Sequence, residues 1–362
     1  MSGRALAVAA WKAGYAPLVA DLFGDEDMRA VACASIRTGG DLATGLDETA
    51  LLDSLTRLAA GRHCEGLVCG SGFEDRPGAL ARLAQHWPLL GNDAATVVRA
   101  KDPFAFATLC GDLGIPHPAV RATRPADARN WLRKRVGGSG GTHVQAASRE
   151  PESLEPTYYQ RQVAGRAVSA LFLANGWEAR LVGFSAQWSS PTRAQPARYG
   201  GAVRPAGIDH RLKKELGRVL GPLSRALRLR GLNSADFLVG DQDFWLIEIN
   251  PRPGATLDLF DASPAPLFDL HADACRGTLP ARAPRLPGAA AVAIVYATRL
   301  VPEMPALDWP YWCADLQVAG TSLRAGEPIC SVRANASSSA RAKALAEARG
   351  LAILARTQGE RR

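Results

Sequence analysis

The spacing of hydrophobic residues changes several times along the chain, and each spacing predicts a different element. Residues 4–13 are rich in Ala and give a helical pattern, whereas residues 16–20 and 66–69 are short apolar runs typical of strands. This alternation over the first 95 residues predicts a layered α/β domain. Such a domain normally opens with a strand, but here the helical pattern starts almost at Met1. We therefore expect either that this strand is missing or that the domain starts upstream.

The rest of the chain separates into two further predicted units. Apolar residues recur at helical spacing over residues 101–113, and Gly114-Ile115-Pro116 predicts the end of that helix. The pattern then predicts a strand-rich region as far as about residue 260. Proline-rich stretches follow, and after them come a short strand over residues 292–297 and a final helix rich in Ala and Arg. The predicted domains are an α/β domain over residues 1–95, a central domain over residues 96–270 and a small β-rich domain with a terminal helix over residues 271–362.

The strongest chemical signal is a hairpin predicted between Leu232 and Arg252. In its second strand, alternation puts Glu248 and Asn250 on one face with Leu246. The same alternation puts three apolar residues on the other face, namely Trp245, Ile247 and Ile249. If the turn spans residues 240–244, Asp236 stands opposite Glu248, with their Cβ atoms roughly 5 Å apart.

Two opposed carboxylates repel each other unless a cation lies between them. Oxygen atoms of Asp, Glu and Asn are the ligands that suit Mg²⁺. The hairpin therefore predicts a divalent metal site formed by Asp236, Glu248 and Asn250. The alternative is a hairpin that faces solvent and carries ordinary surface acids.

A glycine-rich turn follows the strand predicted over residues 131–136. Its five small residues expose the backbone N–H groups that bind anions, and they are Gly137, Gly138, Ser139, Gly140 and Gly141. Lys134 precedes the turn and would reach a nucleotide from the strand. This is not the P-loop pattern, because no Gly-Lys-Ser/Thr follows the glycines. The turn predicts a flexible lid over phosphates, with a mobile surface hairpin as an equal alternative.

Taken in order, four segments resemble the ATP-grasp superfamily. They are Lys101-Asp-Pro opening a helix that ends in Gly-Ile-Pro-His-Pro, Lys134 with the glycine turn, Gln160-Arg-Gln-Val-Ala-Gly165, and Asp236 with Glu248-Ile-Asn250-Pro-Arg252. The resemblance covers residues 1 to about 260. It implies an α/β (α+β) chain with the ATP-grasp fold, in which a Rossmann-like domain precedes the ATP-grasp domain and a small β-rich domain follows it.

The resemblance also implies how ATP binds. Lys101 and Lys134 would contact the phosphates and the glycine turn would close over them. Adenine would be met by the segment that consists of Gln160, Arg161, Gln162 and Val163. Many members carry Glu after Gly-Arg to hold the ribose, whereas this chain has Ala167, so the ribose contact is left open.

The metal and catalytic residues follow from the same resemblance. Asp236, Glu248 and Asn250 match the ligands of one or two Mg²⁺ ions, with Mn²⁺ as an alternative. Arg252 stands where members place a cation near the transferred phosphoryl group, and its fixed donors suit that role. Arg252 and Lys134 are therefore the expected catalytic residues. His143, just past the glycine turn, is interpreted as a polar loop residue.

Four short stretches resemble a narrower group, the little-characterised ATP-grasp carboligase-like proteins of methylotrophs and methanogens. They are Asp21-Leu-Phe-Gly-Asp, Gly70-Ser-Gly-Phe-Glu, Leu90-Gly-Asn and Tyr199-Gly-Gly. This implies a step in making a one-carbon carrier cofactor of the tetrahydromethanopterin or methanofuran type. We expect the substrate carboxylate at a long loop over residues 187–205 that carries Arg193, Arg198 and Arg204, with a solvated surface loop as the alternative.

These features predict an ATP-dependent carboxylate-amine ligase that forms a C–N bond through an acyl phosphate and releases ADP and phosphate. Its partners would be a small-molecule carboxylate and an amine. The first alternative is a bicarbonate-activating carboxylase similar to biotin carboxylase. The second is a nucleotide-binding protein without turnover.

Composition narrows the setting of this activity. Lys and Arg number 43 and Asp and Glu 35, a net charge of +8, but the basic residues are spread over the whole chain, so no nucleic-acid partner is predicted. No apolar run approaches the roughly 20 residues of a membrane helix, and no membrane partner is predicted. The seven cysteines stand singly and predict reduced core residues. We expect a cytoplasmic protein, with a homodimer left open.

Overall fold

A computed structural model describes residues 2–42, 44–149, 156–261 and 265–359 of the chain. Its N-terminal part consists of α1 Arg4–Lys12, β1 Leu18–Asp21, α2 Glu26–Arg29, β2 Ala34–Arg37, β3 Gly40–Asp41, β4 Gly45–Leu46, α3 Glu48–Ala59 and α4 Pro77–Leu83. The predicted first helix and the strand that ends at Asp21 are confirmed, and β1 pairs with β2 in parallel. The strand predicted over residues 66–69 is wrong, because the segment makes only a single bridge between Leu67 and Leu89.

Two helices and a small sheet follow. They are α5 Ala94–Lys101, α6 Pro103–Asp112, β5 Val120–Arg121, β6 Trp131–Arg135, β7 Gln145–Ala146 and β8 Thr157–Arg161. The strands form an antiparallel sheet in the order β5-β8-β6-β7. The predicted helix over residues 101–113 begins later than expected: Lys101 ends α5, and Asp102 caps α6 by accepting from the backbone N–H groups of Phe104 and Ala105.

The largest unit is an eight-stranded sheet with the order β13-β12-β9-β10-β11-β14-β16-β15. Its strands are β9 Arg166–Asn175, β10 Ala179–Ser189, β11 Tyr199–Arg204, β12 Arg230–Val239, β13 Phe244–Asn250, β14 Ala289–Tyr296, β15 Cys313–Ala314 and β16 Pro328–Ala336. The strands of the predicted C-terminal domain therefore continue the sheet of the central domain through the pairing of β11 with β14. The boundary predicted after residue 270 falls inside α9 Leu267–Cys275.

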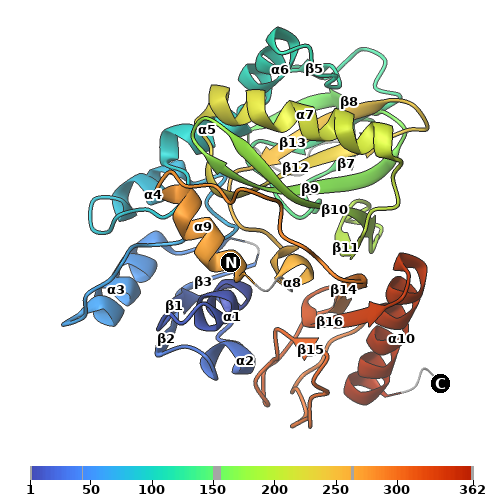
Figure 1. Cartoon of the computed structure of the whole chain (residues 1–362). Coiled ribbons are helices and arrows are strands. Elements are labelled where there is room, and N and C mark those ends of the chain that lie inside the picture. The colour runs from blue at the N-terminus through green and yellow to red at the C-terminus, as the bar shows by residue number, and fades with distance from the viewer. Residues whose placement is uncertain (1, 43, 150–155, 262–264, 360–362) are drawn as a thin grey trace.

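Helix α7 His210–Leu227 covers one face of this sheet and interrupts a region predicted to be strand-rich. Its leucines recur mostly four residues apart, and those at positions 212, 216, 220, 223 and 227 are all buried in a core shared with residues of β9, β10, β12 and β13. Figure 1 shows the helix lying along this face of the sheet. The region is strand-rich as predicted, from β5 to β13, but this helix was not predicted; Gly221 and Pro222 weaken the helical signal in the sequence. The Leu stripe packed on the sheet outweighs them.

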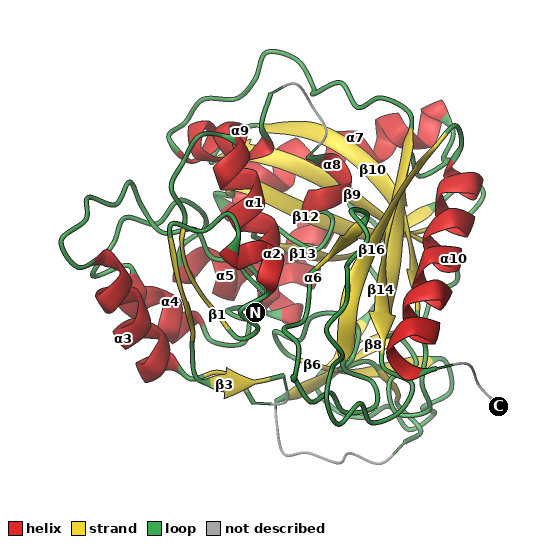
Figure 2. Ribbon diagram, turned by 90° about the horizontal axis from the view of Figure 1, so that it is seen from below, coloured by secondary structure: helices red, strands yellow, loops and turns green. Residues whose placement is uncertain are grey.

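The remaining helices cover the other parts of the sheet. Residues of α1, α8 Leu257–Phe260 and α9 pack together with inner residues of β9, β10, β12 and β14 in a second core. The last helix, α10 Ser339–Gln358, lies along β14 and β16, as Figure 2 shows, and buries Ala342, Ala346 and Ile353 there. The predicted final helix and the strand at residues 292–297 are confirmed.

Candidate active site

The hairpin predicted from the sequence is formed by β12 and β13, and Asp236 is paired with Glu248 as expected. The register near the turn differs from the prediction. The turn spans residues 240–243, so Val239 pairs with Phe244, and this register, if continued, would pair Asp236 with Ile247. A β-bulge between Asp236 and Phe237 on this ladder shifts the register by one residue and restores the opposition of the two carboxylates.

The same bulge changes which side chains share a face. Leu246 and Ile249 both lie in the core beneath α7, although strict alternation puts them on opposite faces. The prediction that Leu246 accompanies Glu248 and Asn250 is therefore wrong, and so is the grouping of Ile249 with Ile247. Because the extra residue turns the strand, Glu248 and Asn250 face away from that core.

The three predicted metal ligands lie together on this face. The side-chain amide of Asn250 donates to Oδ2 of Asp236 at 2.9 Å. Oδ1 of Asp236 is buried and has no hydrogen-bond partner within the described part of the chain. Burial, and then the charge of Glu248, raise the pKa of Asp236 above its usual range. Burial alone would do the same to Glu248, but the cations Lys101 and Lys134 hold its pKa well below that range.

Lys101 reaches this group from the end of α5. Its Nζ lies 3.0 Å from Oε2 of Glu248 and donates to Oδ1 of Asn250 at 2.9 Å. Sequence reasoning paired Lys101 with the phosphates of a nucleotide. The structure places its ammonium among the predicted metal ligands, where it balances the charge of Glu248.

Lys134 and Gln160 face each other from neighbouring strands β6 and β8. Both side chains are buried, and Nζ of Lys134 donates to Oε1 of Gln160 at 2.9 Å. Burial lowers the pKa of Lys134, and the charge of Glu248 opposes this shift. Of the other residues predicted to meet adenine, Arg161 ends β8, and Gln162 and Val163 follow it directly.

The glycine turn lies against two other segments rather than free of the molecule. Gly137, Gly140 and Gly141 have positive φ angles, which glycine adopts without strain. A Cβ atom on Gly137 would lie 2.7 Å from Cα of Asp75, and one on Gly141 would overlap the carbonyl oxygen of Ala197. The carbonyl of Gly140 accepts from the backbone N–H of Tyr199 at 3.0 Å. The carbonyl of Ser139, in the same turn, accepts from Oγ1 of Thr142 at 3.5 Å.

His143 lies in the turn that directly follows the glycines, as its interpretation as a polar loop residue expects, and it is half-buried there. A Cβ atom on Gly138 would overlap the imidazole ring, so the two are in direct contact. Burial is the largest cause that lowers the pKa of His143, to about 4, while Glu248 opposes the shift. Its Nδ1 is buried without a hydrogen-bond partner in the described residues. At neutral pH this ring is therefore uncharged.

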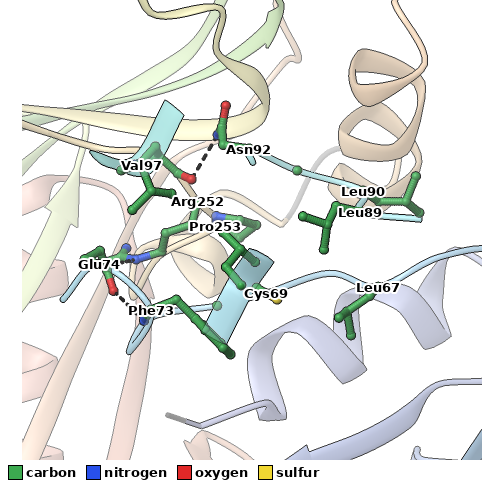
Figure 3. Close-up of a pocket in the computed structure, with 14 residues that line it drawn as sticks. Leu67, Cys69, Phe73, Glu74, Leu89, Leu90, Asn92, Val97, Arg252 and Pro253 are labelled. Atoms are coloured by element: carbon green, nitrogen blue, oxygen red, sulfur yellow. Dashed lines mark hydrogen bonds and ion pairs between the residues drawn. The ribbon is translucent and has the colours of Figure 1, made fainter. Parts of the chain in front are cut away.

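Arg252 is held by a residue that sequence reasoning did not select. Its Nε donates to Oε1 of Glu74 at 2.7 Å, and Figure 3 shows the two side chains meeting between the N-terminal part and the end of β13. They line a cavity of about 20 Å³ together with Asn92 and Pro253. That volume is enough for a single water molecule. No sequence signal other than the Gly-Phe-Glu order pointed to Glu74.

The three arginines expected to bind a substrate carboxylate make no hydrogen bond with this group in the described part of the chain. The loop between β10 and β11 spans residues 190–198, and Arg204 lies within β11, so the predicted loop over residues 187–205 is too long at both ends. Arg198 donates to the carbonyls of Ser190 and Gly326, and Arg204 donates to those of Leu259, Pro287 and Gly288. Arg193 is exposed in the loop.

Two general properties of the molecule add to this picture. Among the described residues, no group of three or more His, Cys, Asp or Glu side chains is arranged to hold a metal ion, so the candidate set is two carboxylates and one amide. None of the described helices combines the length and the apolar character that crossing a bilayer requires.

Comparison with known proteins gives a consistent result for the fold. A family model described as an ATP-grasp domain matches residues 101–256. Biotin carboxylase from Campylobacter jejuni, solved as a β-γ-ATP complex, is 16% identical with a TM-score of 0.71, and the alignment covers 94% of this chain and 87% of that one.

Two further solved structures show the same fold. The N5-carboxyaminoimidazole ribonucleotide synthetase from Thermus thermophilus is 19% identical with a TM-score of 0.67, covering 99% of this chain and 96% of that one. The biotin carboxylase domain dimer of 2-oxoglutarate carboxylase from Hydrogenobacter thermophilus, in complex with MgADP, ADP and bicarbonate, is 11% identical with a TM-score of 0.69, covering 92% and 84%. The expected α/β fold class is thereby confirmed.

Proposed function

Because an ATP-grasp domain model matches residues 101–256, we propose that this chain is an ATP-dependent ligase that joins a small-molecule carboxylate to an amine. The observation that carries the proposal is one face of the β12–β13 hairpin. There the oxygen donors of Asp236, Glu248 and Asn250 meet the ammonium group of Lys101, with Lys134 close enough for its charge to act on Glu248. Oxygen donors beside cations are the arrangement that a nucleotide with its metal requires.

The donor set fits Mg²⁺. It consists of hard oxygen ligands, and Oδ1 of Asp236 is a buried acceptor without a partner in the described residues. Asp236, Glu248 and Asn250 would hold one or two ions, with Mn²⁺ as the alternative. A bound divalent ion would neutralise charge on the phosphates and orient them.

The protein's own residues would position the reactants. Lys101 and Lys134 would bind the phosphates, and the turn from Gly137 to Gly141 would lie over them. A carboxylate oxygen attacks the γ-phosphorus, the bond to ADP breaks and an acyl phosphate forms. The charge that develops is stabilised by Arg252, while the closed turn keeps water out. The amine nitrogen then attacks the acyl carbon, phosphate leaves, and the amine loses a proton.

The nucleoside would lie at the end of β8. We assign adenine to the segment from Gln160 to Val163, because buried Gln160 connects this segment directly to Lys134. Ala167 offers no polar group to the ribose. The ribose hydroxyls would therefore face solvent or a neighbouring backbone group.

A second candidate is bicarbonate as the carboxylate, which would make the enzyme a carboxylase. It is favoured by the similarity to a carboxylase domain that was solved with MgADP and bicarbonate. The two functions share the same activation step and differ in the acid that attacks ATP. A nucleotide-binding protein without turnover is the remaining candidate, and the complete set of oxygen donors and cations argues against it.

The amide bond formed would belong to a one-carbon carrier cofactor of the tetrahydromethanopterin or methanofuran type, and the enzyme would act in the cytoplasm. Its domains would divide near residue 95 and near residue 270, with the strands after the second boundary continuing the central sheet. A homodimer would agree with the domain dimer named for the Hydrogenobacter structure.

The test is ATP consumption with Mg²⁺ against a panel of carboxylates, amines and bicarbonate, with ADP and AMP measured separately. We expect ADP and phosphate only when a matching carboxylate and amine are both present, and loss of this activity in Glu248→Gln. Phosphate release with bicarbonate and no other acid would replace the ligase with the carboxylase. ATP binding without turnover in any combination would contradict both enzymes.

A further inference from the structure

The ion pair between Glu74 and Arg252 links the N-terminal part to the proposed reaction site. Only 3% of the Glu74 side chain and 14% of the Arg252 side chain are exposed. Oε1 of Glu74 accepts from Nε of Arg252 at 2.7 Å. Its Oε2 accepts from the backbone N–H groups of Gly72 at 2.8 Å and Phe73 at 3.1 Å. Both oxygens are therefore fixed, one by the backbone and one by the guanidinium (Figure 3).

The charge state of Glu74 follows from these contacts. Burial opposes ionisation, but Arg252 and Lys101, together with the backbone N–H groups, lower the pKa of Glu74 to about 2. Glu74 is thus a carboxylate throughout the neutral range, and the ion pair persists there. A buried charged hydrogen bond of this kind is stronger and more directional than an exposed one.

The ion pair with Glu74 involves only the Nε atom of the Arg252 guanidinium. Within the described residues, the two terminal nitrogens of Arg252 have no hydrogen-bond partner, although its charge is close enough to lower the pKa of Asp236. A Cβ atom on Gly254 would lie 2.6 Å from Nη1 of Arg252, so the space beside this nitrogen exists because residue 254 is a glycine. The donor pair formed by Nη1 and Nη2 is left for an anion.

We propose that Glu74 is the positioning residue of Arg252, holding the guanidinium by its Nε so that the Nη edge is presented to the phosphoryl group and the incoming carboxylate. The inference rests on the proposed function, since it assigns the anion to that reaction. A long arginine side chain without this partner must give up its rotamer freedom in every catalytic cycle. Glu74 removes that requirement, and Gly254 leaves room for the Arg252 guanidinium in the position that Glu74 fixes.

The backbone of Glu74 also contacts the glycine turn. A Cβ atom on Gly137 would lie 2.7 Å from the carbonyl oxygen of Glu74, so the glycine turn rests on the backbone of the residue whose side chain holds Arg252. One short segment of the N-terminal part therefore supports both the turn that would cover the phosphates and the cation that would act on them.

The first test is Glu74→Gln. An amide can accept from Arg252 or from the two backbone N–H groups, but its NH₂ group then faces a donor on the other side. We expect kcat to fall about 10- to 100-fold, as for a misplaced catalytic group, with KM for ATP unchanged within about twofold. The matched control is Glu65→Gln, which removes an exposed Glu–Arg pair of 2.9 Å with Arg276, and it should keep kcat.

Two further variants separate positioning from folding. Gly254→Ala pushes the end of the Arg252 side chain aside while leaving Glu74 intact, and it should lower kcat in the same way even if Glu74→Gln folds poorly. In an Arg252→Ala background, Glu74→Gln should lower kcat no further, because the residue it positions is gone. A wild-type kcat in both Glu74→Gln and Gly254→Ala, or an equal loss in the Arg252→Ala background, would overturn the inference.

A binding measurement keeps this inference distinct from the proposed function. Calorimetry would compare the affinity for inorganic phosphate in the presence of MgADP between the wild type and Glu74→Gln. We expect about a tenfold loss for phosphate and no change for MgADP alone. If the wild type shows no turnover with any substrate but this phosphate effect is present, the ligase is wrong and the positioning role stands. Equal phosphate affinities would reject the positioning role even for an active ligase.

Discussion

Replacing Gly141 by Ala tests whether the glycine turn must lie against the segment around Ala197. The φ angle of Gly141 is +73°, so an L side chain there costs about 1 to 2 kcal/mol. Its Cβ would also overlap the carbonyl oxygen of Ala197. That oxygen must retreat by about 1.5 Å to reach an ordinary contact distance. The hydrogen bond from Tyr199 to Gly140 would be lost with it, at about 1 kcal/mol.

The neighbouring glycine provides a matched control. Gly140 has a φ angle of +67°, and a Cβ atom there would meet nothing within 4 Å. Gly140→Ala therefore carries the same backbone cost as Gly141→Ala without the overlap. Any difference between the two variants isolates the docking of the turn.

We expect Gly141→Ala to lower kcat/KM for ATP about 100-fold relative to Gly140→Ala, since a displacement of this size at a phosphate-binding group is costly. The assay is steady-state ATP consumption with the best carboxylate and amine found in the panel, with MgADP affinity measured in parallel. Equal kcat/KM values for the two variants would refute the reasoning. The contact of the turn with Ala197 would then not be needed for ATP consumption.

Three further predictions concern stability and metal dependence. His271 accepts a hydrogen bond from the backbone N–H of Leu232, and burial lowers its pKa from 6.5 to about 4. Its contribution to the free energy of unfolding is therefore complete above about pH 6.5 and is lost as pH falls through 4. Urea unfolding should lose about 3 kcal/mol between pH 7.5 and 4 through this group, and His271→Gln should remove most of that loss. Leu216 of α7 is fully buried against the sheet, and Leu216→Ala should cost about 2 to 5 kcal/mol in the same assay while exposed Arg218→Ala costs almost nothing. Glu248→Gln should raise the Mg²⁺ concentration for half-maximal ATP binding at least about tenfold, measured by titration at fixed ATP, and an unchanged Mg²⁺ dependence would remove Glu248 from the metal site.

The β12–β13 hairpin shows which features of the site can be predicted from the sequence. Periodicity and charge repulsion found Asp236, Glu248 and Asn250, because their spacing survives small errors in the strand. They did not find the bulge, which depends on how Leu246 and Ile249 pack beneath α7. Alternation along one strand cannot reveal a residue inserted to satisfy packing on another element.

Helix α7 illustrates a different limit. Its leucines at four-residue spacing were present in the sequence, but Gly and Pro within it lowered the helical signal. The structure resolves the conflict through tertiary contacts, since the whole Leu stripe is buried on the sheet. Propensity is a weak indicator where a complete hydrophobic face can be buried.

Glu74 and His143 were beyond sequence reasoning for a physical reason. Glu74 meets a residue 178 positions away, and the His143 ring packs against a turn that itself contacts distant segments. Contacts of this kind arise only when separate parts of the chain close on one another.

Together these contacts leave the site balanced in charge. Lys101 faces Glu248, Arg252 faces Glu74, and His143 is neutral because burial keeps its pKa at about 4. A nucleotide that entered alone would have to break Lys101 away from Glu248 and would leave that carboxylate beside its phosphates. Under the proposed function, entry together with divalent ions would avoid this repulsion, because Asp236 and Glu248 would hold the ions and Lys101 would be free to contact the phosphates. The arrangement therefore favours ATP binding that is strongly coupled to the metal.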